Sequence, residues 1–212
     1  MKKITFIISI IIGLSIFAQE IDYSIAANSV YKYIRNSIQL KDTTLKIVWR
    51  EEVYDSKLKQ NVSTIMLNES YFKNVSEPEK AAIGYLATFV GNECQWDGSP
   101  NSEQNNIKCK ILSALGLGYQ CSESNKDFFK KWFSESSAVI NELENCKSSL
   151  VSTNEQTSFK NISVSTKNDE IKIKYSAITA NISKQKFENW NEEVTFKLNN
   201  DKLDLVKRTK KK

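Results

Sequence analysis

Residues 162–177 of this 212-residue chain read ISVSTKNDEIKIKYSA, a stretch in which apolar and polar side chains alternate on both sides of a polar turn at 167–170. The same alternation recurs in residues 190–198 and 203–205. A period of two residues is typical of antiparallel strands that have one apolar face and one face in water. The pattern therefore predicts a four-stranded antiparallel meander over residues 159–208.

The apolar face of such a sheet needs a covering layer, and residues 19–148 supply mainly helical patterns. Apolar residues recur every three or four positions, the spacing of a helix face, in segments 23–40, 77–95, 107–115 and 124–146. Ser76 and Glu79 have the spacing of a capping box before the second segment. Gly116 can end the third in a Schellman turn, and Ser124 can begin the fourth. We expect an α+β fold in which a disulfide-clamped helical segment packs on the meander.

Three shorter stretches complete this organisation. Alternating apolar residues at 45–53 and a β-branched run at 62–67 predict a hairpin within residues 45–67. The polar residues 149–158 are expected to form a linker, and residues 209–212 a basic tail beyond the last strand.

The N-terminus has the order of a secretory signal peptide. Lys2 and Lys3 precede an apolar run at residues 4–17, and Ala18 follows it. This run is shorter than the roughly 20 residues that a helix needs to cross a bilayer. We therefore expect cleavage near Ala18 rather than a retained anchor, and a periplasmic or secreted protein.

Four cysteines lie within one short part of the chain: Cys94, Cys109, Cys121 and Cys146. In an oxidising compartment, an even number of cysteines at such spacings favours disulfides over free thiols. We expect two disulfides that clamp the helical segment, and the sequence leaves all three connectivities open. No CxxC pair is present to indicate a metal site or a redox centre.

The sequence contains no histidine. Histidine is the usual general base near neutral pH and a common ligand of zinc, copper and iron. Its absence excludes serine–histidine–aspartate triads, cysteine–histidine pairs and zinc sites of the HExxH type. Together with the lack of CxxC pairs, it leads us to expect no metal site and no cofactor.

The basic residues are concentrated at the C-terminus. Residues 19–206 carry 23 basic and 25 acidic side chains, so composition indicates no basic face for nucleic acid. Five more basic residues follow: Lys207, Arg208, Lys210, Lys211 and Lys212. This run is either a solvated tail or a peripheral contact with an anionic surface, such as lipid headgroups or lipopolysaccharide.

Candidate site residues are densest at 91–98, where the second helix is expected to end. Glu93 and Asp97 are four residues apart, so a continuing helix would place both carboxylates on one face, as a glycosidase-like acid and base require. The same residues also suit a turn, because Asp97 precedes glycine. Trp96, Tyr119 and Gln120 are candidates for the border of a binding groove.

These observations predict an exported, non-catalytic binding or interaction protein of the bacterial cell envelope. Its partner would be a protein or an envelope ligand, and an immunity or inhibitor protein is one specific version. The alternative is a hydrolase that uses Glu93 and Asp97 on a glycan or cell-wall substrate. A structural component held to an anionic surface by its terminal lysines is a third hypothesis.

Overall fold

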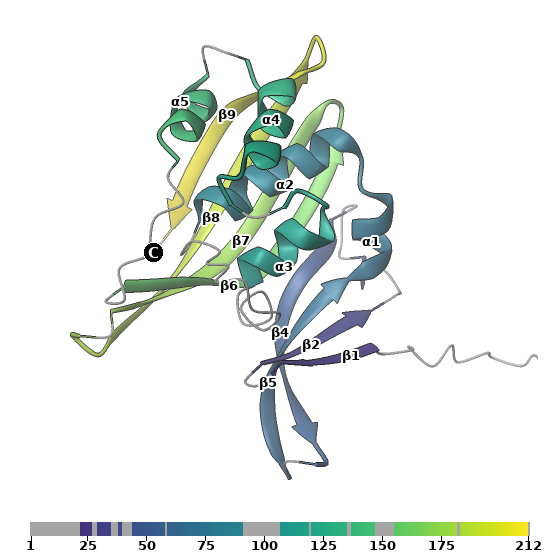
Figure 1. Ribbon diagram of the computed structural model, residues 1–212, viewed down its shortest axis with the longest axis vertical. Helices are drawn as coiled ribbons and strands as arrows, with labels where there is room; N and C mark the ends of the chain where they lie inside the picture. The colour runs from purple at the N-terminus through teal and green to yellow at the C-terminus, as the bar shows by residue number, and fades with distance from the viewer. Residues whose placement is uncertain are drawn as a thin grey trace, which may run out of the picture.

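A computed structural model shows a mixed α and β fold, and the described part of the chain forms one mostly antiparallel sheet of nine strands. The strand order is β1-β2-β5-β4-β6-β7-β8-β9, and β3 pairs with β4. The structure describes residues 22–26, 29–34, 38–39, 44–57, 59–90, 107–118, 120–134, 137–146, 155–181 and 183–211. The helices gather on one face of the sheet (Figure 1).

The C-terminal strands lie where the alternation of side chains predicts them. They are β6 (Glu155–Lys167), β7 (Glu170–Asn181), β8 (Lys186–Asn199) and β9 (Lys202–Lys211), each antiparallel to the next. Asn168 and Asp169, and again Asn200 and Asp201, have positive φ angles of 46° to 62° in the two-residue turns. Asparagine and aspartate tolerate this conformation and therefore favour such hairpins.

The predicted hairpin at 45–67 is confirmed. It consists of β4 (Leu45–Asp55) and β5 (Gln60–Asn68), with Val48 opposite Leu67. The four strands of the predicted meander do not form the whole sheet, because β4 also pairs with β6 and places Val48 opposite Ile162. Alternation within one strand gives its inner and outer faces but carries no information about its neighbour at the sheet edge.

The predicted helix at 23–40 is wrong. This segment forms β1 (Asp22–Ala26), β2 (Ser29–Ile34) and β3 (Ile38–Gln39). β2 runs parallel to β5, with Val30 opposite Thr64. Aromatic and β-branched residues are frequent here and suit strands, and the long-range pairing with β5 outweighs a local helical spacing.

The helices are α1 (Glu69–Asn74), α2 (Glu77–Phe89), α3 (Ile107–Ala114), α4 (Glu123–Trp132) and α5 (Ala138–Glu144). The predicted Schellman turn is present: Leu117 donates to the carbonyl of Leu112, and Gly116 has a φ of 66°. None of the helices described is long and apolar enough to cross a membrane.

Several predicted helix boundaries need correction. The helix predicted over 77–95 ends at Phe89, because Val90 is extended. The hydroxyl of Ser76 donates to the carboxylate of Glu79, so the capping box does not form.

The single helix predicted over 124–146 is two, α4 and α5. Ser122, rather than Ser124, caps α4 through the backbone N–H of Asn125, and Ser137 caps α5. Phe133 between them is extended and forms a β-bridge with Leu203. Serine side chains compete with helical backbone bonds, which favours a break in this serine-rich stretch.

The predicted linker and tail are both shorter than expected. β6 begins at Glu155, inside the expected linker 149–158. β9 continues to Lys211, so most of the expected tail is part of the sheet. Hydrogen bonding to β8 orders this segment, because Asn191 lies opposite Lys211.

An aromatic group joins the helices to the sheet. Tyr85 of α2 lies 5.7 Å from Phe133 and 5.9 Å from Phe196 of β8, between ring centroids. All three side chains are buried in one hydrophobic core that spans both layers. Aromatic contacts of this kind stabilise beyond the area they bury.

A disulfide joins Cys121, just before α4, to Cys146, just after α5, with the Cα atoms 5.6 Å apart. Cys109 is also disulfide-bonded. Cys94 lies outside the described residues. The bond between Cys121 and Cys146 closes the α4–α5 segment into a loop on the sheet, which is part of the clamp that the sequence predicts.

Candidate functional site

Most of the predicted site residues lie outside the part of the chain that the structure describes. These are Glu93, Trp96, Asp97 and Tyr119, and the signal segment 1–18 and Lys212 lie outside it as well. Gln120 is described and is only 8% exposed, directly before Cys121.

The face of β6–β9 opposite the helices is polar, and none of the helices described covers it. We call it the open face and define it by twelve side chains: Asn161, Ser163, Ser165, Lys172, Lys174, Ser176, Asn191, Glu193, Thr195, Lys207, Thr209 and Lys211. All except Thr195 are exposed or half-buried. The apolar residues of the same strands alternate with them and face the helices.

Register places these twelve residues in three rows across the four strands. The first row runs Ser165, Lys172, Thr195, Lys207, the second Ser163, Lys174, Glu193, Thr209, and the third Asn161, Ser176, Asn191, Lys211. Neighbouring side chains within a row belong to adjacent strands about 5 Å apart. The open face is therefore a continuous field of hydroxyl, amide and ammonium groups.

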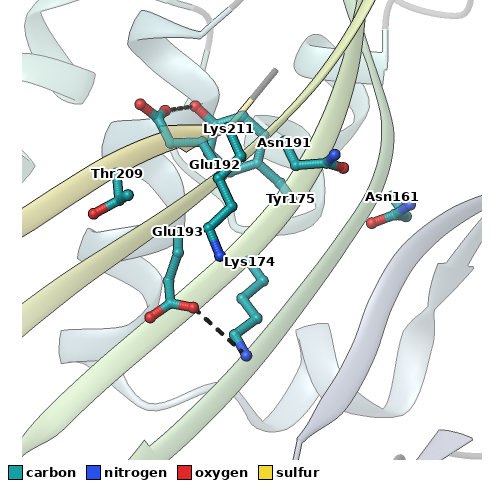
Figure 2. A pocket seen from close by; sticks show the side chains of 8 residues that line it. All are labelled: Asn161, Lys174, Tyr175, Asn191, Glu192, Glu193, Thr209 and Lys211. Carbon is teal, nitrogen blue, oxygen red and sulfur yellow. Dashed lines mark hydrogen bonds and ion pairs between the residues drawn. The ribbon is translucent and has the colours of Figure 1, made fainter.

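A hollow of about 250 Å³ lies in this face. It is lined by Asn161, Lys174, Tyr175, Asn191, Glu192, Glu193, Thr209 and Lys211. Figure 2 shows Lys174 and Glu193 pointing toward one another, with Asn161 and Thr209 on opposite sides of the hollow. Because alternation turns Tyr175 and Glu192 toward the other side of the sheet, they contribute the floor of the hollow.

Positive charge exceeds negative charge on the open face. Its one carboxylate, Glu193, lies 3.5 Å from the ammonium group of Lys174 and 3.9 Å from that of Lys172. Lys207 and Lys211 have no acidic partner among the residues that the structure describes. Two of the four lysines therefore present an unpaired charge to solvent.

Beneath the hollow, on the helix-covered side, lies a buried polar group. Glu192 is only 6% exposed and accepts hydrogen bonds from the hydroxyl of Tyr175 and, at 2.9 Å, from Nε of Arg208. Burial, followed by the hydrogen bond to Glu192, raises the pKa of Tyr175 well above its usual value. Burial alone would lower the pKa of Arg208, but Glu192 raises it. Since Tyr175 stays protonated and Arg208 charged, this group is structural in character.

Aromatic rings flank this polar group. Tyr175 makes edge contacts with Phe159 at 5.4 Å and with Trp190 at 5.6 Å, between ring centroids. The ammonium group of Lys210 lies 3.9 Å from the centre of the Trp190 ring, a cation–π contact. The C-terminal basic run is therefore divided: Arg208 and Lys210 contact Glu192 and Trp190 on the helix-covered side, while Lys207 and Lys211 belong to the open face.

The open face is suited to binding polar groups. Glu192 and Glu193 are consecutive on β8 and project to opposite sides, so they do not form a carboxylate pair. Within the described ranges, no cluster of three or more acidic or cysteine side chains could hold a metal ion. What the face offers is a rigid array of hydrogen-bond donors and acceptors with surplus ammonium groups.

Sequence reasoning misses the open face because it treats the polar positions of the strands as a solvent-exposed side. The signal is nevertheless present in the alternation itself. Residues 172–176 alternate lysine or serine with apolar residues, and residues 207–211 carry basic side chains at nearly every position. Continuing the alternation to the last residue would have predicted that the basic run is divided between two faces, but with the members of each face exchanged, because the extra residue at Val206 reverses the alternation. No protein-family model, curated protein or solved structure matches this chain.

Proposed function

We propose that this protein is a non-catalytic binding protein of the cell envelope that contacts its ligand with the open face. The observation that carries the proposal is the hollow in a polar sheet surface that no described helix covers. The sheet and the helices packed on it hold this surface in place, so the protein loses little conformational entropy when a ligand binds. The disulfide between Cys121 and Cys146 supports a location in an oxidising compartment.

The composition of the open face favours an envelope ligand over a protein partner. Protein interfaces are rich in aromatic residues, methionine and arginine at their centre and poor in lysine and serine. None of the twelve open-face residues belongs to the first group, and seven are lysine or serine. An immunity or inhibitor role, which requires a protein partner, is therefore the less favoured version.

The test is retention of envelope material on the immobilised protein, purified from the exported fraction of producing cells. Asn191→Trp fills the hollow, and Asn199→Trp makes the same change on the same strand beside the turn at Asn200. We expect the wild type and Asn199→Trp to retain the same component, and Asn191→Trp to lose it. Equal retention by both variants would place the binding surface elsewhere. Release of soluble fragments from the retained material would instead indicate a hydrolase.

A further inference from the structure

We propose that the open face binds an acidic polysaccharide, a sugar chain that carries carboxylate groups. This inference rests on the proposed binding function and names the ligand class of the same surface. It depends on three features of the face: its surplus charge, the spacing of the charges and the polar groups between them.

The surplus charge is positive over the whole open face. Four lysines stand against one carboxylate, that of Glu193. The next row toward the turns adds Lys167 and Lys197 but also Glu170 and Asp204, so it contributes no net charge. The excess positive charge therefore lies over the hollow and the rows beside it, where it would attract an anionic ligand most strongly.

The lysines are spread out rather than converging on one point. Lys172 and Lys174 lie on β7, and Lys207 and Lys211 lie on β9, two strands or about 10 Å away. One small anion could contact only some of these groups. A polymer with a repeated negative charge can contact all of them at once, and each contact adds to the others.

Uncharged polar groups fill the space between the lysines. Asn161 donates a hydrogen bond of 2.5 Å to Ser176, and Asn191 and Thr209 line the hollow beside them. Amide and hydroxyl groups of this kind both donate and accept, which matches the hydroxyl groups of a sugar. A lipid surface or a simple polyanion would leave these groups without a role.

The face is poorly suited to nucleic acid. Single strands are held largely by stacking of bases on aromatic rings. Trp49, the next residue in the third row, is only 2% exposed. None of the twelve open-face residues is aromatic, so the face offers no ring for such stacking. We therefore favour a sugar chain as the polyanion.

The test measures binding of the full exported protein to polygalacturonate, with dextran as a neutral polysaccharide, at low salt and at increasing salt. The sheet-face variant is Lys174→Gln/Lys211→Gln. The matched control is Lys130→Gln/Lys131→Gln on α4, which removes the same charge from exposed residues on the helix side. We expect polygalacturonate but not dextran to bind, about tenfold or more weaker binding by the sheet-face variant, and an unchanged control. Binding should weaken as salt rises.

A second variant, Asn191→Ala, separates sugar recognition from general attraction of anions. It should weaken binding of polygalacturonate and leave binding of polyphosphate unchanged. Equal binding of dextran, tighter binding of duplex DNA, or sedimentation with phosphatidylglycerol vesicles without binding of polygalacturonate would each overturn the inference. If envelope material is still lost by Asn191→Trp while polygalacturonate does not bind, the binding function stands and the ligand class is wrong.

Discussion

Tyr175 and Glu192 lie directly opposite each other on β7 and β8, and the tyrosine hydroxyl donates a hydrogen bond to the glutamate on the helix-covered side of the sheet. Arg208 of β9 donates to the other carboxylate oxygen. Three consecutive strands are thus connected by one polar group within an apolar layer. The same sheet segment carries the hollow on its other side, so this group supports the candidate site.

Replacement of Glu192 should destabilise the protein strongly. Glu192→Ala leaves Arg208 and the Tyr175 hydroxyl without their acceptor, and breaking a buried ion pair costs about 3 to 5 kcal/mol. Because the side chain of Arg208 is 37% exposed, we expect the free energy of unfolding to fall by about 2 to 3 kcal/mol, at or below the lower end of that range. Glu193→Ala on the exposed side should cost less than about 1 kcal/mol. Urea denaturation of both variants checks this, and equal midpoints would contradict it.

Stability should fall at alkaline pH. Burial raises the pKa of Tyr71, Tyr85 and Tyr175 above the usual value of 10.0. Above pH 10 the unfolded chain loses these protons while the folded chain keeps them, so the free energy of unfolding declines. The stabilisation is complete below pH 10, and each tyrosine should contribute a loss of about 1 kcal/mol between pH 10 and 11.

The measurement is denaturant unfolding at pH 8, 10 and 11, for the wild type and for Tyr85→Phe. The hydroxyl of Tyr85 donates to Glu142 at 2.7 Å, so the variant should be less stable at pH 8. Its further decline with pH should nevertheless be shallower than that of the wild type. Parallel curves for the two proteins would show that Tyr85 titrates normally.

Removal of the α4–α5 disulfide should lower stability without unfolding the sheet. Cys121 and Cys146 are 25 positions apart, and closing a loop of this length contributes about 3 kcal/mol. Cys121→Ala/Cys146→Ala should lose about this amount in denaturant titration. The double variant is preferable to reduction, because Cys109 is also disulfide-bonded. Unchanged stability would mean that this bond does not restrain the unfolded chain.

Gly84→Ala should be destabilising even though alanine is the better helix former. A Cβ at position 84 would overlap the Cδ1 atom of Leu117 and lie 3.2 Å from the Phe129 ring. We expect a net loss of about 1 to 2 kcal/mol. Combining it with Leu117→Ala should cost less than the sum of the two single changes. Strict additivity in thermal or urea unfolding would show that the two positions do not compete for space.

Elements that depend on nearby residues were predictable from the sequence. The hairpin at 45–67, the turns at Asn168 and Asn200 and the Schellman turn at Gly116 all depend on local alternation or local backbone preference. The prediction of a helix over 23–40 is wrong because β2, which forms in this segment, pairs with β5 some 30 residues away in sequence. Local spacing alone cannot reveal that competition.

The candidate site was less predictable than the fold. Its hollow depends on which outer side chains lie side by side, and that depends on register between strands. A β-bulge at Val206 adds a further shift, because Phe196 pairs with Leu205 while Thr195 pairs with Lys207. Without this extra residue, regular alternation would turn Lys207 inward and Arg208 outward.

The position of β9 at the edge of the sheet has a consequence for proteolysis. A single cleavage after Val206 would remove the guanidinium that neutralises Glu192 and, at the same time, two of the four ammonium groups of the open face. Loss of this part of β9 would therefore weaken the fold and remove positive charge from the open face at the same time.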